Sequence, residues 1–177
     1  EIYYKAFNKK GVNLTSDIRV TFNGGPESWQ PSIAIDRRRN VPLVWSDNRD
    51  RDGDEEIYYK KLTAFGKNLT ADIRLSHSSG PSFLPDIKVD RNEDVHVVWS
   101  DGRNSYQSVY YVKLNRFGVN LTSELPITTG PRAMSPKIAL DTQNNFHLVW
   151  IQGLRGEVFY RKFDNFGQPL LPEIQIT

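Results

Sequence analysis

The most regular feature of the chain is a short apolar run that ends in tryptophan and occurs three times. Nearly every position in each run is apolar, a pattern that predicts a strand buried on both faces. Shorter segments flank each run, and turn-forming residues separate them. The runs are 41–45, 95–99 and 146–150, and the segments before them are 32–35, 86–89 and 137–140. Two segments follow each run: the first is 56–62, 108–114 or 157–163, and the second is 72–75, 124–128 or 173–176. The pattern therefore predicts units of four short strands, with no helical period longer than one turn.

The same unit recurs along the chain at intervals of about 50 residues. Segments 61–70 (KLTAFGKNLT) and 113–122 (KLNRFGVNLT) are identical at seven of ten positions. Paired aromatic residues and Gly-Pro pairs keep the same spacing. They are Tyr3-Tyr4, Tyr58-Tyr59, Tyr110-Tyr111 and Phe159-Tyr160, and Gly25-Pro26, Gly80-Pro81 and Gly130-Pro131. Such self-similarity indicates a repeat architecture.

Four-stranded antiparallel units at this period, each with a doubly buried second strand, predict an all-β chain built of β-propeller blades. Because the chain opens with the third and fourth strands of a blade (2–7 and 17–21), we expect about three and a half blades in a single propeller, 1–177. The predicted blades are a half-blade at 1–24 and complete blades at 25–79, 80–129 and 130–177. An unpaired strand edge invites association. We therefore expect a further segment of the protein, or other copies of the chain, to close the ring.

Three patterns carry a resemblance to a known family: S-x-x-P-x-I-x-[IVL]-D, V-x-[VL]-V-W-S-D-x-R and [EV]-[IVF]-[YF]-Y. Over essentially its whole length the chain resembles the sialidase-like (BNR-type) β-propeller repeats of prokaryotic surface proteins. The resemblance implies a propeller fold and an extracellular or cell-surface location. However, no unit contains the Asp-box of that family, S-x-D-x-G-x-x-W. We therefore predict a non-enzymatic binding module or scaffold, for glycans or another protein. The alternative is a fragment of a sialidase-like glycoside hydrolase.

A sialidase-like enzyme needs an arginine cluster, a tyrosine nucleophile with a carboxylate partner, and a separate acid. Such residues should each occur once, not in every repeat. The non-repeated polar residues expected near the centre are Glu27, Lys88, Arg132 and Gln152, and they do not form that set. His96 and His147 occupy equivalent positions in two blades, which favours structural hydrogen bonds over catalysis. We accordingly predict no catalytic residue.

Large apolar side chains and arginines are expected together on one face of the propeller, where the blade-to-blade loops and the hairpins after the second strands lie. The apolar candidates are Trp29, Phe83 and Met134, and the arginines are Arg49, Arg103 and Arg155. The combination is similar to the sugar pockets between blades of lectin propellers. Alternatively, the apolar residues seal the seams between blades, and the repeated Asp-x-Arg pairs fasten turns.

The hairpin after Trp45 contains a partial calcium-binding pattern. Asn48, Asp50, Asp52 and Glu56 provide oxygen ligands, and Gly53 permits a sharp turn. Arg49 and Arg51 place positive charge in the same loop, which favours a solvated hairpin instead. We therefore expect calcium to bind weakly or not at all, and no other cofactor.

Composition narrows the function classes further. The chain has 177 residues with 23 basic and 21 acidic side chains, so its net charge of +2 argues against a nucleic-acid surface. It has no cysteine, which excludes disulfides and thiolate chemistry. No apolar run is long enough to span a membrane as a helix.

Overall fold

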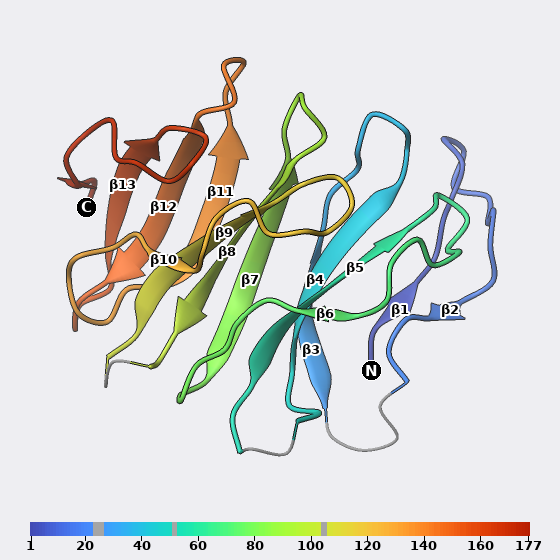
Figure 1. The fold of residues 1–177 in the computed structure, drawn as a ribbon, viewed down its shortest axis with the longest axis horizontal. Coiled ribbons are helices and arrows are strands. Elements are labelled where there is room, and N and C mark those ends of the chain that lie inside the picture. Colours follow the sequence, from blue (N-terminus) through green and yellow to red (C-terminus); the bar gives the residue numbers. More distant parts are fainter. Residues whose placement is uncertain (23–26, 51–52, 104–105) are drawn as a thin grey trace.

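The computed structural model describes residues 1–22, 27–50, 53–103 and 106–177, and within these ranges it contains strands and no helices. The strands form one two-stranded and three four-stranded antiparallel sheets (Figure 1). The two-stranded sheet consists of β1 (Tyr3–Tyr4) and β2 (Ile18–Arg19). The others are β3 (Ser28–Ile33), β4 (Val41–Asp47), β5 (Glu56–Leu62) and β6 (Ile73–Arg74); β7 (Ser82–Val89), β8 (Val95–Asp101), β9 (Ser108–Leu114) and β10 (Leu125–Pro126); and β11 (Met134–Leu140), β12 (Phe146–Gln152), β13 (Glu157–Phe163) and β14 (Ile174–Gln175). The predicted all-β fold of four-stranded blades is confirmed.

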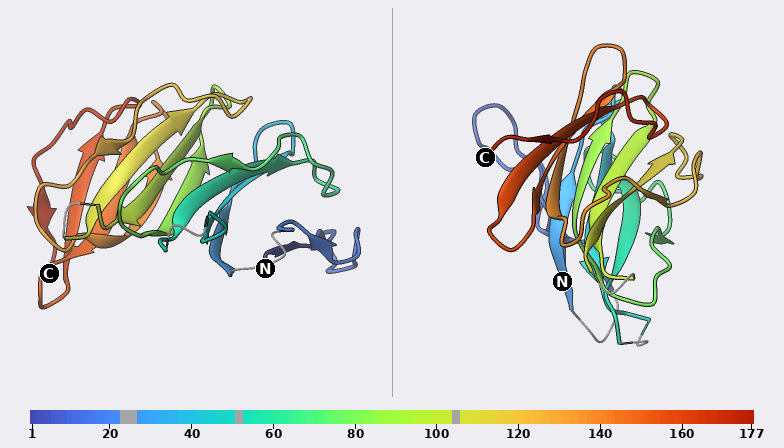
Figure 2. Two further views of the ribbon diagram at one scale, coloured as in Figure 1. Left: turned by 60° about the horizontal axis from the view of Figure 1, so that its bottom comes forward. Right: turned by 90° about the vertical axis from the view of Figure 1, so that its left-hand side faces the viewer.

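The sheets stand side by side along an arc, with the half-blade β1–β2 at one end and the sheet β11–β14 at the other (Figure 2). Strands β3, β7 and β11 come first in their sheets, and β7 packs against both of the others. These three inner strands therefore bring successive blades together. Gly25-Pro26, predicted to open the first complete blade, lies outside the described residues.

The core lies between the sheets. Trp45, Trp99 and Trp150 are buried, as predicted for the ends of the apolar runs. Each tryptophan is directly opposite an aromatic residue of the third strand, and their ring centroids lie 5.9–6.1 Å apart. Because both faces of β4 and β8 contact neighbouring sheets, these strands show no alternation between apolar and polar positions.

The inner strands begin earlier than the sequence pattern predicts. β3 and β7 start four residues before the expected positions, at Ser28 and Ser82, and β11 starts three residues before, at Met134. The reason is a β-bulge in each strand, which lets pairing continue past the residue before a proline. The fourth strands, in contrast, are only two residues long.

The turns at Phe65-Gly66 and Phe117-Gly118 pack against the preceding blade. Gly66 has φ of +79°, and a Cβ there would overlap the Cδ1 of Ile18 in the half-blade. Gly118 faces Ile73 of the blade before it in the same way. A side chain at either position would therefore strain the backbone and displace an isoleucine side chain of the preceding blade. None of the described residues belongs to a helix that could cross a membrane.

Candidate functional site

The three inner strands carry bulges at equivalent positions. Gln30, Leu84 and Ser135 have φ of +52°, +54° and +56°, values unusual for residues other than glycine, and each precedes a proline. The Gln30 amide oxygen accepts a hydrogen bond from the backbone N–H of Leu84 in the next blade at 2.8 Å. Bulges re-aim the side chains that follow them and are common beside active sites. The residues just after these bulges are therefore candidates for a functional site.

Asp86 follows the bulge in β7 and lies where the three inner strands meet. Its carboxylate accepts a hydrogen bond from the Ser32 hydroxyl on β3 at 2.8 Å. It accepts a second from the backbone N–H of Ile138 on β11 at 3.0 Å. The Lys88 ammonium lies 3.7 Å away. Asp86 thus joins three blades through a carboxylate whose side chain is nine-tenths buried.

Sequence reasoning did not identify Asp86, although a signal was available. In the motif Pro-x-Ile the middle residue is Ser32, Asp86 or Lys137, so this column of the repeat differs in charge while its neighbours stay constant. Of the non-repeated residues named from the sequence, Glu27 and Arg132 are exposed. Gln152 accepts a hydrogen bond from the indole N–H of Trp150.

The hairpins that end the inner strands surround a cavity of about 490 Å³. Its lining includes the exposed residues Arg37 and Arg91 and the polar side chain of Asn144. The aspartates of these hairpins bind groups of the protein itself. Each accepts amide hydrogen bonds from its own turn and pairs with a lysine of the third strand. These pairs are Asp36–Lys61, Asp90–Lys113 and Asp141–Lys162.

His96 is a structural residue in this arrangement. It lies 3.3 Å from Asp90 and 2.9 Å from the hydroxyl of Tyr111 in its own blade. Burial lowers the pKa of His96, although the hydrogen bond with Asp90 opposes this effect. His147 makes the equivalent contact with Tyr160 at 2.9 Å.

Arg49 and Arg103, predicted to contact a ligand, are bound by carboxylates of their own blades. Arg49 contacts Asp47 at 2.7 Å and Asp72 at 2.5 Å, and its guanidinium lies 4.3 Å from the Tyr58 ring centroid. Arg103 contacts Asp101 and Glu124 in the same manner. These contacts match the alternative role, in which the Asp-x-Arg pairs fasten turns.

The apolar candidates lie on the innermost strands, away from the arginine of their own blade. Trp29 is paired with Ser46, whereas Arg49 covers Trp45. Since neighbouring residues of a strand point to opposite faces, the Trp29 and Arg49 side chains lie on opposite faces of the sheet. Phe83 and Met134 occupy the corresponding positions, and all three are half-buried. Arg155 is exposed and has no ion pair with any described residue. A ligand site formed by these six residues stays a prediction.

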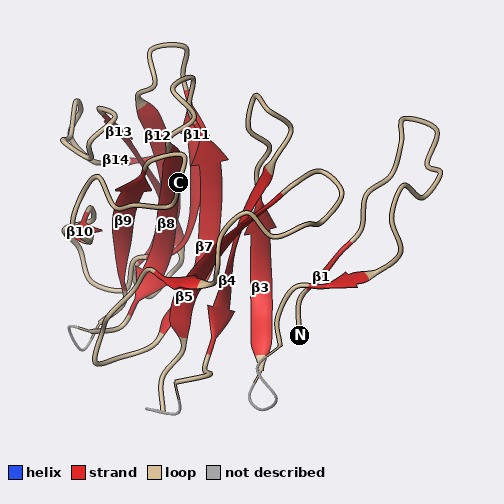
Figure 3. Ribbon diagram, turned by 45° about the vertical axis from the view of Figure 1, so that its right-hand side comes forward, coloured by secondary structure: helices blue, strands red, loops and turns tan. Residues whose placement is uncertain are grey.

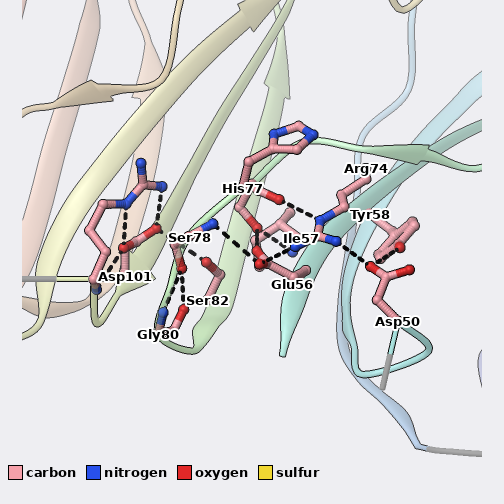
Figure 4. Close-up of polar contacts among 12 residues, drawn as sticks. Asp50, Glu56, Ile57, Tyr58, Arg74, His77, Ser78, Gly80, Ser82 and Asp101 are labelled. Carbon is pink, nitrogen blue, oxygen red and sulfur yellow. Dashed lines mark hydrogen bonds and ion pairs between the residues drawn. The ribbon is translucent and has the colours of Figure 1, made fainter. Parts of the chain in front are cut away.

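Two of the calcium candidates, Asp50 and Glu56, contact an arginine. Figure 4 shows Arg74 between Asp50, at 2.7 Å, and the buried Glu56. Burial raises the pKa of Glu56 above its usual range, although Ser76 and Arg74 both oppose the shift. The Asn48 amide oxygen is buried without a hydrogen-bond partner, and Asp52 lies outside the described residues. Among the residues that the structure describes, no three acidic or histidine side chains are placed to hold a metal ion.

Comparisons with known proteins place the fold. No protein-family model and no curated protein matches the chain. Among solved structures, an α-L-arabinofuranosidase from Fusarium graminearum in complex with an iminosugar inhibitor matches 99% of this chain over 58% of its own length, with a TM-score of 0.69 and 16% identity. This is the fold of β-propeller glycoside hydrolases.

Two further structures support the same fold. A GH43_1 enzyme from Xanthomonas citri complexed with xylose has a TM-score of 0.61 at 10% identity, and the match covers 84% of this chain and 55% of that one. An endo-arabinase from Bacteroides thetaiotaomicron has a TM-score of 0.53 at 14% identity, with 77% and 55% covered. The chain therefore spans a little over half the length of these structures.

These comparisons correct two predictions from the sequence. The sialidase-like resemblance holds only at the level of a broadly related propeller fold, because no family model confirms the BNR-type repeats. The prediction of a non-enzymatic protein is contradicted, because several structures that share the fold are glycosidases. The missing Asp-box and sialidase residues argue only against a sialidase. They do not exclude another glycosidase whose catalytic groups lie at non-repeated positions.

Proposed function

We propose that this chain forms part of a β-propeller glycoside hydrolase acting on polysaccharides that contain arabinose or xylose. The likeness to an arabinofuranosidase and to a xylose-bound enzyme supports the class of reaction and substrate. The observation that carries the proposal is Asp86, a carboxylate at the junction of three inner strands, where the other blades have Ser32 and Lys137. A catalytic group is expected to occur once in this way.

Asp86 suits the role of base or nucleophile. Both of its hydrogen bonds are donated to the carboxylate, by the Ser32 hydroxyl and the Ile138 N–H, so its oxygens act as acceptors. These donors come from two other blades and fix the carboxylate in place before substrate binds. A proton donor is the complementary group in glycoside hydrolysis.

Asp86 and its two hydrogen-bond donors do not include the second carboxylate, the proton donor, so that group lies elsewhere. Glycosidases hold their two carboxyl groups about 5–10 Å apart. Glu27 precedes β3 and is five residues from Ser32, so at about 3.3 Å per residue it is about 17 Å away along the chain. That distance is too long for the pair. We therefore assign the proton donor to residues beyond these three and a half blades, consistent with the partial coverage of the similar structures.

Hydrolysis of 4-nitrophenyl α-L-arabinofuranoside and β-D-xyloside tests the proposal, with protein expressed from its whole reading frame. We expect turnover of at least one substrate, and Asp86→Asn should lower kcat by about 10²–10⁴-fold, the usual contribution of a catalytic acid or base. Asp164→Asn is the matched control. Asp164 closes an outer turn by accepting the N–H groups of Phe166 and Gln168, so activity should persist.

Thermal unfolding of both variants separates catalysis from folding, because Asp86 also joins blades. A folded Asp86→Asn variant with unchanged kcat would refute the role of Asp86. Absence of turnover on both substrates and on arabinan and xylan would refute the proposed function.

A further inference from the structure

The turn that follows β9 carries an exposed aromatic side chain that the turn itself does not need. Phe117 is 65% exposed. Its backbone N–H and that of Val119 donate to the Asn115 side chain at 2.9 and 3.1 Å. In the half-blade the same turn forms around Asn8, with Lys10 at the position of the phenylalanine. Because the turn forms without an aromatic residue, the surroundings of the Phe117 ring indicate what the ring does.

The ring borders a cavity in the seam between two blades that both have four strands. Figure 3 shows the sheet that begins with β3 beside the sheet that begins with β7, and loops of both blades line the cavity. The first blade supplies Arg38, Asn40 and Leu69, and the second supplies Glu93 and Phe117. The volume is about 280 Å³, close to the lower limit of about 300 Å³ for small-molecule sites. None of the lining residues belongs to the candidate site on the inner strands.

A buried lysine fixes the turn of the second blade against the first. The Lys61 ammonium pairs with Asp36 at 2.7 Å and donates to the backbone carbonyl of Arg116 at 3.2 Å. Both Lys61 and Asp36 are buried. The position of the neighbouring Phe117 is therefore set before any ligand arrives, which lowers the entropic cost of binding.

The cavity also offers hydrogen-bond donors and acceptors close together. The Arg38 Nε–H donates to the Glu93 carboxylate across the seam, 3.0 Å from one oxygen and 3.1 Å from the other. The terminal amino groups of Arg38 can still donate, and the carboxylate oxygens can accept further hydrogen bonds. Sugar hydroxyls both donate and accept, and the C–H groups of a sugar ring pack on the negative face of an aromatic ring. An exposed ring beside an Arg–Glu pair therefore suits a sugar.

The next seam lacks this combination. There the Lys113 ammonium lies 4.8 Å from the centroid of the Phe166 ring, so a cation already lies over that ring. Two uncharged residues, Asn92 and Asn144, stand where the first seam has its ion pair. The site is thus not a general feature of the repeat, and the second seam provides a matched control.

We propose that the seam cavity around Phe117 binds one pentose unit of a polysaccharide that contains arabinose or xylose. The choice of sugar rests on the proposed function, whereas the site rests on the cavity and its side chains. The sugar ring stacks on Phe117, and Arg38 and Glu93 bind its hydroxyls. Because Phe117 and Arg38 are largely exposed, the polymer can continue over the surface on either side. A polymer held here raises the effective concentration of its other units at the catalytic site.

Affinity electrophoresis in gels that contain arabinan or arabinoxylan tests the binding, with protein expressed from its whole reading frame and at a low temperature that slows hydrolysis. We expect the polysaccharide to retard the protein. Phe117→Ala should weaken binding by about tenfold, since one aromatic contact is lost. Phe166→Ala removes the equivalent exposed ring of the next seam and should leave binding unchanged. Thermal unfolding should show both variants folded, because both side chains are exposed.

Kinetics separates this inference from the proposed function. Phe117→Ala should raise KM for the polysaccharide and leave kcat/KM for the 4-nitrophenyl glycosides unchanged, because a single sugar cannot occupy two sites. Retardation that depends on Phe117 in a protein without any turnover would support the site and refute the proposed function alone. Equal retardation of wild type and Phe117→Ala would overturn the inference even if the nitrophenyl substrates are hydrolysed. So would the absence of retardation in both polysaccharides.

Discussion

Replacing Asp47 by alanine tests the strongest polar cluster in the fold. Asp47 is fully buried and accepts hydrogen bonds from the Trp45 indole at 2.8 Å and the Ser28 hydroxyl at 2.9 Å. It also pairs with Arg49 at 2.7 Å. The substitution leaves a buried indole N–H and hydroxyl without this acceptor, and it leaves Arg49 with Asp72 alone.

The expected cost follows from these contacts. Removing one partner of a buried ion pair costs about 3–5 kcal/mol. Arg49 keeps Asp72 and retains some contact with water, so the lower half of that range applies. The unpaired indole contributes about 1–3 kcal/mol that overlaps with this loss. We therefore expect Asp47→Ala to lower the free energy of unfolding by about 3–4 kcal/mol.

The third complete blade, 130–177, supplies a natural control. Gln152 stands at the position of Asp47 and accepts the Trp150 indole N–H at 2.8 Å, but as an uncharged side chain it forms no ion pair. Gln152→Ala should cost about 1–2 kcal/mol, since a neutral hydrogen bond is lost. Urea unfolding followed by tryptophan fluorescence measures both values. If Asp47→Ala costs no more than Gln152→Ala, the ion pair does not stabilise the blade and the reasoning is wrong.

The pH dependence checks the same cluster. Burial alone would raise the pKa of Asp47, but the hydrogen bonds from Arg49, Trp45 and Ser28 hold that pKa below its ordinary value. A lowered pKa in the folded state stabilises the protein above the unfolded-state pKa, about 4, and this stability is lost as the pH falls through the folded value. The difference between wild type and Asp47→Ala should thus be constant from pH 7 to 5 and shrink below about pH 4.

Two further predictions concern the core and the hairpin after β4. Trp99→Ala should lower the free energy of unfolding by about 3–5 kcal/mol, because this fully buried side chain packs between two blades; a loss below about 1 kcal/mol in urea would contradict its place in the core. Calcium should produce no binding heat in low-salt calorimetry, because Arg74 already neutralises Asp50 and Glu56; a micromolar dissociation constant would show that the ion displaces Arg74.

The sequence alone determined the blades, because their signals are local. The apolar runs that end in Trp45, Trp99 and Trp150 predict the doubly buried strands, and their spacing predicts how many blades the chain contains. Even the role of the Asp-x-Arg pairs was open to sequence reasoning, since Asp47 and Arg49 are only two residues apart. Strand pairing within a blade follows from short turns and a fixed repeat.

Only the tertiary structure brought the residues of the candidate site together. Asp86 meets Ser32 and Ile138 across 54 and 52 residues, and Arg49 meets Asp72 across 23. A repeat pattern is defined by the residues that the blades share, whereas the candidate site around Asp86 is built from positions at which the blades differ. Such contacts come from the packing of separate blades, so they become visible only when the blades are placed around their common axis.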